Sequence, residues 1–87
     1  MATNGREWTE LDRELMRTIR EVWDSSSPRP SNRAVARAIG VTHPRVADLM
    51  SGAHGTPTVD EYCSLCALFG LAPGRTLEEA MRRVGLG

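Results

Sequence analysis

The sequence predicts an all-α protein in which five short helices pack around one core. Three observations carry this prediction. Apolar residues recur three and four positions apart, a hydroxyl residue stands where most of the expected helices begin, and a glycine stands where most of them end. No stretch alternates between polar and apolar residues with a period of two. Because 87 residues suffice for one small domain but not for two, we treat residues 1–87 as a single domain.

The first helix is expected from Glu7 to Asp24. Its apolar residues follow helical spacing and would share one face: Trp8, Leu11, Leu15, Met16, Ile19, Val22 and Trp23. The segment SSSPRPS, residues 25–31, then ends the helix, because two prolines and a serine cluster cannot continue it. Frayed tails are expected at residues 1–5 and 86–87.

A short turn is expected between the second and third helices. Ser31 can cap the second helix, which ends at Gly40, and glycine permits the left-handed backbone that a tight turn requires. The facing sides would form an apolar seam of Val35, Ala36, Ile39, Val41, Val46 and Leu49. This spacing, over about residues 31–51, is typical of a helix-turn-helix.

The third helix is expected to begin at Thr42 or His43 and to end before Gly52. Pro44 falls in its first turn, where the missing N–H needs no partner and the fixed φ suits a helix start. Since proline also disfavours helical geometry in the residue before it, His43 is as suitable a cap as Thr42. Pro44 is thus interpreted as a start signal rather than an interruption.

The last two helices are predicted from capping boxes, Thr58 with Glu61 and Thr76 with Glu79, and are expected to close at Gly70 and Gly85. Their apolar faces would comprise Val59, Cys63, Cys66, Ala67 and Phe69 in the fourth helix, and Leu77, Ala80, Met81 and Val84 in the fifth.

Residues 31–84 resemble the lambda-repressor-like (Cro/XRE-type) family of DNA-binding domains. The segment PTVDEYCSLCALFGLAPGRTLEEA is similar to the family's typical PTLDTLLKLAKALGVSPDEL, with two extra residues before the last helix. The chain departs from the family pattern in the loop SGAHGTP, which lacks Lys and Arg, and at Pro44, where many members carry a polar base-reading residue. The resemblance implies a helix-turn-helix regulator whose third helix lies in the major groove.

The charge distribution agrees with that implication better than the net charge does. The net charge of zero argues against a nucleic-acid partner. However, residues 25–57 carry four arginines and one acid, Asp48, so the helix-turn-helix is locally basic. His43 and His54 fall in the same third of the chain and would add to that charge when protonated.

The expected base-reading residues lie at the start of the third helix: Thr42, His43, Pro44, Arg45, Ala47 and Asp48. Arg45 is the expected specific contact, because its planar fork matches guanine O6 and N7. Asp48 would accept from cytosine N4 or hold Arg45 through an i,i+3 pair. Pro44 and Ala47 would offer apolar contact to a thymine methyl.

The expected phosphate contacts are Arg29, Ser31, Asn32, Arg33, Arg37, Ser51, His54 and Thr56. Arg33 and Arg37 stand four apart on one helix face and repel each other, and phosphate would relieve that repulsion. One copy would contact too few bases for useful affinity. We therefore expect a homodimer on a pseudo-palindromic operator in double-stranded DNA, with half-sites about 10 base pairs apart or a multiple of that.

Other chemistries find little support in the sequence. Cys63 and Cys66 form CSLC without a second ligand pair, so we interpret them as small core residues and expect no metal and no cofactor. His43 and His54 have no acidic or cysteine partner in the sequence pattern that would make a catalytic dyad, and we expect neither enzymatic activity nor a small-molecule substrate. No apolar run is long enough for a membrane span and the first residues lack a signal peptide's apolar middle, so a cytoplasmic, nucleoid-associated protein is expected.

These features predict a small transcriptional regulator that binds DNA sequence-specifically. A compact Cro-like repressor of phage or mobile-element type fits best, with an excisionase-type controller or an antitoxin regulator as variants of the same idea. A second hypothesis comes from another class: a helix-turn-helix scaffold used mainly for protein contact, such as an anti-repressor, with weak or no DNA binding. The zero net charge and the weakly basic loop favour this alternative.

Overall fold

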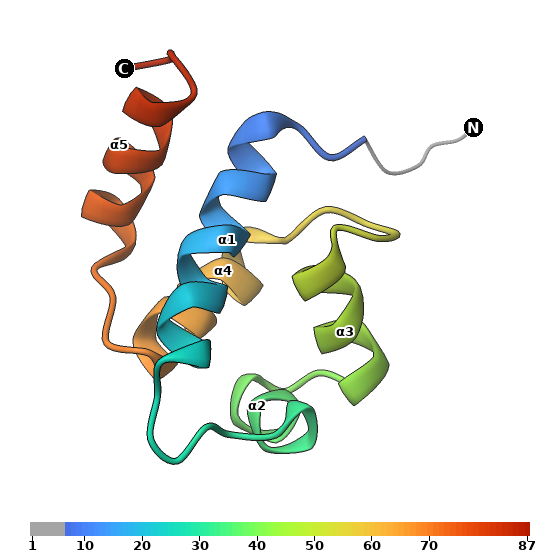
Figure 1. Ribbon diagram of the computed structural model, residues 1–87. Helices are drawn as coiled ribbons and strands as arrows, with labels where there is room; N and C mark the ends of the chain where they lie inside the picture. The colour runs from blue at the N-terminus through green and yellow to red at the C-terminus, as the bar shows by residue number, and fades with distance from the viewer. Residues whose placement is uncertain (1–6) are drawn as a thin grey trace.

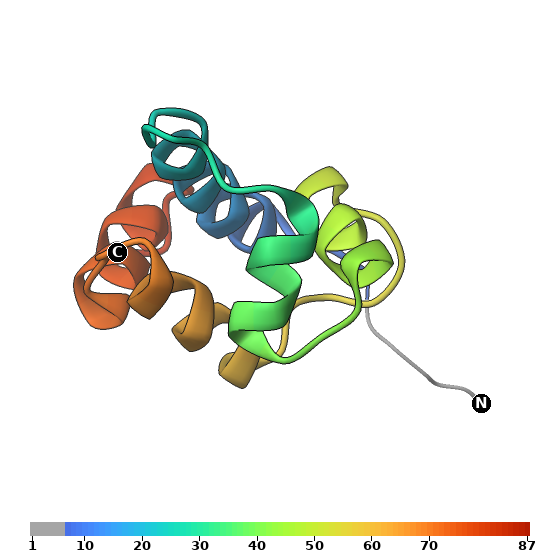
Figure 2. The same ribbon diagram turned by 90° about the horizontal axis from the view of Figure 1, so that it is seen from below.

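The computed structural model describes residues 7–87 and consists, over that range, of five helices without strands (Figure 1). The helices are α1 (Glu10–Asp24), α2 (Asn32–Ile39), α3 (His43–Ser51), α4 (Val59–Leu68) and α5 (Pro73–Arg83). The predicted all-α class is thereby confirmed. The two views place α3 and α5 on opposite sides of α1, and α2 next to α3 (Figures 1 and 2).

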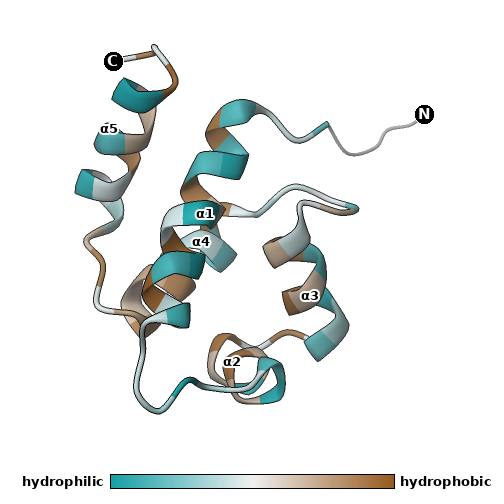
Figure 3. Ribbon diagram, in the orientation of Figure 1, coloured by the Kyte–Doolittle hydropathy of each residue, from teal (hydrophilic) through white to brown (hydrophobic). Residues whose placement is uncertain are grey.

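The core lies where the five helices converge. The outer side of α5 is hydrophilic (Figure 3), and its buried residues Thr76 and Ala80 face inward. The largest fully buried side chains come from four helices: Ile19, Trp23, Val35, Val46, Leu49, Leu65 and Cys66. Trp23 stacks on Phe69 with ring centroids 5.9 Å apart and donates to the carbonyl of Pro30 at 2.7 Å. This one side chain thus ties α1 both to α4 and to the segment before α2.

Two predicted helix starts differ from the observed ones, those of α1 and α5, whereas the start of α3 agrees with one of the two expected alternatives. Helix α1 begins at Glu10 rather than Glu7, because Thr9 and Asp12 form a capping box. Helix α3 is capped by Thr42, whose hydroxyl accepts from the amide of Arg45, and His43 is its first residue.

The predicted start of the last helix was wrong. The expected capping box of Thr76 with Glu79 does not form, since α5 begins three residues earlier at Pro73. Proline is favoured in a first helical turn because it has no N–H to satisfy there. Thr76 is instead a buried residue within α5, and its amide donates to the carbonyl of Ala72 at 2.9 Å.

The predicted capping box of α4 is confirmed, but the predicted apolar face of that helix was right only for Cys66, which is buried, and for Phe69, which packs against the core. Thr58 and Glu61 cap each other reciprocally. The helix buries Tyr62, Leu65 and Cys66, whereas Val59 is 79% exposed and Cys63 is exposed. The face is therefore rotated from the one that the pattern of small residues indicated, because the bulky Tyr62 and Leu65 gain more from burial than Val59 and Cys63 do.

The expected fraying was tested only at one end. Residues 1–5 lie outside the described residues. At the other end, the amides of Leu86 and Gly87 donate to the carbonyl of Met81 at 2.7 and 3.2 Å. Gly85 turns the chain back with a φ of 82°, so the last two residues are attached to α5 rather than frayed.

Candidate nucleic-acid interface

Helices α2 and α3 meet through a three-residue turn that the sequence explains closely. Ser31 caps α2 by accepting from the amide of Ala34, and Gly40 ends it with a φ of 78°, in the left-handed region. Thr42 then caps α3. Val35 and Val46 are fully buried between the two helices, so the pair packs as one unit beside α1.

The surface of α3 that remains exposed carries four residues, His43, Pro44, Ala47 and Ser51, which we call the exposed face of α3. They follow one another at helical spacing, and Val46 and Leu49 occupy the opposite, buried side. Thr42, the cap, is exposed just before them. The face lacks long polar side chains.

Two arginines of α2 stand beside the beginning of this face. Arg33 and Arg37 are exposed and form no ion pair within residues 7–87. Together with Ala36, Val41 and His43 they line a shallow hollow of about 210 Å³. Two uncompensated cations four residues apart attract an anion to this end of the α2–α3 unit.

A second hollow, of about 260 Å³, lies beside the other end of the exposed face. It is lined by Arg20, Trp23, Arg29, Asn32, Ala47, Met50 and Ser51. Arg29 stacks on Trp23, with its guanidinium carbon 4.7 Å from the ring centroid, and also contacts Asp24 at 2.9 Å. Arg29 is thus partly neutralised, whereas Asn32 is exposed at the start of α2.

Arg45 does not occupy the position that was expected for it. Its Nε and Nη2 donate to the two carboxylate oxygens of Glu61 at 2.8 and 2.7 Å, Nη1 donates to the carbonyl of Gly55 at 2.9 Å, and Nη2 donates to that of Thr56 at 3.0 Å. Since a guanidinium has five N–H groups, one remains. A bidentate contact to guanine needs two, so Arg45 is a clamp inside the protein rather than a free base reader.

The pair of Arg45 and Glu61 is shielded from solvent, with 21% and 12% of the side chains exposed. The hydrogen bond from Arg45 lowers the pKa of Glu61, and the same bond raises the pKa of Arg45. Glu61 also accepts from the amide of Thr58 at 2.9 Å as part of the α4 capping box. One carboxylate therefore caps α4 and anchors α3 to it.

Asp48, Ser51 and the loop residues His54 and Thr56 all have partners inside the protein that the sequence did not reveal. Asp48 pairs with His54 across 3.0 Å and not with Arg45, so His54 has the acidic partner that the sequence pattern did not reveal. His54 is exposed and has a positive φ of 58°. Thr56 is half-buried and its carbonyl accepts from Arg45. Ser51 is exposed, and its hydroxyl donates to the carbonyl of Asp48 at 3.3 Å.

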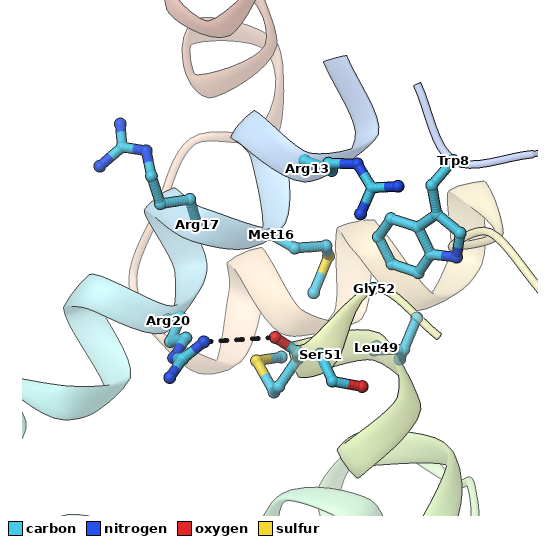
Figure 4. A pocket seen from close by; sticks show the side chains of 9 residues that line it. Trp8, Arg13, Met16, Arg17, Arg20, Leu49, Ser51 and Gly52 are labelled. Atoms are coloured by element: carbon cyan, nitrogen blue, oxygen red, sulfur yellow. Dashed lines mark hydrogen bonds between the residues drawn. The ribbon is translucent and has the colours of Figure 1, made fainter. Parts of the chain in front are cut away.

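Helix α1 fixes the far end of α3. A groove of about 290 Å³ between them is lined by Trp8, Arg13, Met16, Arg17, Arg20, Leu49, Met50, Ser51 and Gly52 (Figure 4). Arg20 donates to the carbonyl of Met50 at 3.5 Å, and Trp8 donates to that of His54 at 2.8 Å. Arg20 of α1 thus holds the end of α3, and Trp8, just before α1, holds the loop after it.

Sequence reasoning missed the residues that hold this surface in place, above all Glu61 and Trp8. Glu61 was assigned only to the capping box of α4, and its second role needs the distance between α3 and α4, which no local pattern contains. Trp8 was assigned to the apolar face of α1, although its indole N–H requires a partner whenever the ring is buried. The need of this N–H for an acceptor was the one sign in the sequence that Trp8 makes a polar contact.

The cysteines and the acidic and histidine side chains provide no further candidate site among the described residues. Burial raises the pKa of the Cys66 thiol, as fits a core residue, but Cys63 is exposed and does not share that environment. Among residues 7–87 no three side chains of His, Cys, Asp and Glu gather as a metal site would require. No helix in that range is long and apolar enough to cross a membrane.

Comparison with protein family models, curated proteins and solved structures gives no match to this chain.

Proposed function

We propose that this chain is a sequence-specific DNA-binding regulator with a lambda-repressor-like helix-turn-helix, and that the exposed face of α3 enters the major groove. The observation that carries the proposal is the pair of uncompensated arginines, Arg33 and Arg37, beside an exposed helix face. The width of the major groove admits one α-helix, and the narrow side chains of this face permit close approach to the base edges.

In this arrangement α2 lies across the sugar–phosphate backbone. Arg33 and Arg37 contact phosphates, with Asn32 at the start of the helix, where free N–H groups favour an anion. The Ser31 hydroxyl accepts from the amide of Ala34 and its carbonyl accepts from the amide of Val35, which leaves its backbone N–H for such a contact. Arg29 contributes less, because Asp24 already neutralises part of its charge.

A homodimer remains part of the proposal. The exposed face of α3 spans about two helical turns and reaches only a few base pairs, too few for useful affinity in one copy. Two copies related by a two-fold axis would double the contacts and read a pseudo-palindrome. We propose that occupation of such an operator represses transcription.

The test is selection of duplexes from a random-sequence pool, followed by measurement of affinity across salt concentrations. With about three phosphates neutralised in each of two subunits, we expect the slope of log affinity against log salt to be near −5. The double variant Arg33→Ala/Arg37→Ala should weaken binding to all duplexes alike and make that slope shallower. A flat slope, or equal binding by the double variant, would remove the basis of the proposal.

A matched control is Arg75→Ala. Arg75 is exposed near the start of α5, on the opposite side of α1 from α3. Arg75→Ala removes one positive charge, as Arg33→Ala alone does, but from a different surface, so it should leave both affinity and slope within a factor of about two of the original. A loss equal to that of Arg33→Ala would mean that total charge, rather than the α2–α3 surface, governs binding.

One observation favours a protein-binding module instead. A largely apolar groove of about 350 Å³ runs between α1, α4 and α5, and the strongly exposed Val59 stands at its edge. Exposed apolar surface of this kind commonly marks a protein contact. If the folded chain binds no duplex even at low salt, this alternative becomes the better account.

A further inference from the structure

Because Arg45 is bonded to Glu61 and the loop, the exposed face of α3 carries an unusual set of side chains. Pro44 and Ala47 lie one turn apart and carry neither donor nor acceptor in their side chains. The other two members are His43, which supplies one polar contact, and Ser51, whose hydroxyl already donates to the carbonyl of Asp48. Apolar carbon therefore occupies the centre of the face.

The charged side chains of α3, Arg45 and Asp48, do not supply the missing polar contacts at the centre of this face. Arg45 has one N–H left and is held against α4 and the loop by four hydrogen bonds. Oδ1 of Asp48 lies 3.0 Å from Nδ1 of His54, and 31% of the Asp48 side chain is exposed. For either to read a base, it would have to leave partners that are already at hydrogen-bond distance.

The major groove presents one apolar group to such a surface, the methyl on C5 of thymine. Every other distinguishing group on the base edges is a donor or an acceptor, which carbon atoms cannot recognise and which they would desolvate at a cost. Resting on the proposed function, we infer that this chain selects its DNA by pyrimidine C5 methyl groups placed under Pro44 and Ala47, with no bidentate base contact from α3.

The surroundings support this geometry. Ala47 borders the hollow that contains Arg29 and Asn32, and His43 borders the hollow that contains Arg33 and Arg37. The apolar centre is thus flanked at both ends by groups suited to phosphate. Phosphate contacts fix the register of a helix in the groove, and a fixed register is what allows contacts as small as methyl groups to discriminate between bases.

The same methyl group exists on thymine and on 5-methylcytosine, and the experiment separates these two sources. Duplexes selected from a random pool are remade with uracil in place of each thymine in turn, which deletes the methyl and keeps the pairing edge. Separately, unmethylated and C5-methylated versions are compared at each cytosine. We expect uracil to weaken binding about four-fold at each position that buries a methyl. Tighter binding after methylation of a cytosine at a contacted position would identify 5-methylcytosine as a source of the methyl group.

The variant Ala47→Ser places a hydroxyl where the methyl contact is expected and should reduce the penalty of uracil at one position per half-site. Ala67→Ser on α4 is the matched control, since Ala67 is also exposed on a helix but lies outside the interface, and it should keep the full penalty. Circular dichroism of both variants shows whether they remain folded.

The outcomes separate the two proposals. If duplexes bind with salt dependence but uracil and thymine bind equally at every position, the methyl inference is wrong and the proposed function stands. If no duplex binds, the proposed function is wrong and the inference falls with it. A penalty for uracil that Ala47→Ser leaves unchanged, and Pro44→Ala also leaves unchanged, would likewise overturn the assignment to these residues.

Discussion

Arg45 on α3 and Arg37 on α2 carry the same charge eight positions apart in the sequence, yet only one of them is available to a partner. On the side of α3 toward α4, Arg45 is held by Glu61 and two loop carbonyls. On the side toward α2, Arg33 and Arg37 are exposed and unpaired among the described residues. The difference shows that an arginine in a basic segment is a candidate contact only after its internal partners are known.

The first consequence concerns stability. Arg45→Met should lower the free energy of unfolding by about 2–3 kcal/mol, because it leaves Glu61 partly buried without its cation and two carbonyls without a donor. For a domain of this size, the melting temperature should fall by about 10–20 °C. Thermal melting monitored by circular dichroism measures this.

Arg37→Met is the matched control for that measurement. Arg37 is exposed and has no partner to lose within residues 7–87, so its replacement should change stability by less than about 0.5 kcal/mol. If Arg37→Met destabilised the fold as much as Arg45→Met, the contrast between the two sides of α3 would be unfounded.

The second consequence concerns the dependence of folding stability on pH. Since the hydrogen bond from Arg45 lowers the pKa of Glu61 in the folded protein, the pair stabilises the fold above the ordinary carboxylate pKa of 4.5. That contribution is lost as the pH falls below this value and through the lowered folded pKa. The stability difference between the original protein and Glu61→Gln should therefore be largest near pH 7 and shrink toward zero in acid.

Other carboxylates titrate in the same range, Glu14 among them, whose pKa is lowered by its hydrogen bond from Arg17. They are present in both proteins and cancel in the difference, so urea unfolding of the two at matched pH isolates Glu61. A difference independent of pH would assign the effect of Glu61 to packing rather than to its charge.

The third consequence concerns the turns at the two ends of α3. Gly40 and Gly52 both have positive φ values, 78° and 73°, so replacement by alanine should cost about 1–2 kcal/mol at either position. A Cβ at Gly40 meets nothing within 4 Å, whereas one at Gly52 would lie 2.8 Å from Nη1 of Arg13. Gly52→Ala should therefore also displace Arg13 from its place beside Trp8.

Tryptophan fluorescence distinguishes these two variants, because displacement of Arg13 changes the environment of Trp8. We expect an altered emission spectrum for Gly52→Ala and an unchanged one for Gly40→Ala. Identical spectra would show that α1 does not hold the end of α3 in the manner described.

The smallest expected effect is that of Asp48→Asn. Asp48 is the acid of the α2–α3 segment, and its pair with His54 is largely open to solvent, since 76% of the His54 side chain is exposed. The replacement should change stability by less than about 1 kcal/mol. It should also strengthen DNA binding a few-fold, because it removes a negative charge near the phosphates. Weaker binding would indicate that Asp48 itself contacts a base.

Sequence reasoning succeeded where the determining interactions are local. Gly40 and Thr58 cap their helices through residues a few positions away, Val35 and Val46 meet across one short turn, and α2, α3 and α4 were predicted within about two residues. It failed where packing decides. The capping box expected at Thr76 does not form, because α5 already begins at Pro73 and Thr76 is buried in the core. Arg45 was misassigned because its partner Glu61 lies 16 positions away.

The most direct test of the central claim is a backbone amide NMR titration of the chain with a selected duplex. We expect the largest shift changes at the start of α2 and in α3, at residues 32–37 and 42–47, and little change in α4 and α5. Changes concentrated on Val59 and the groove between α1, α4 and α5, or an absence of changes with the protein folded, would contradict it.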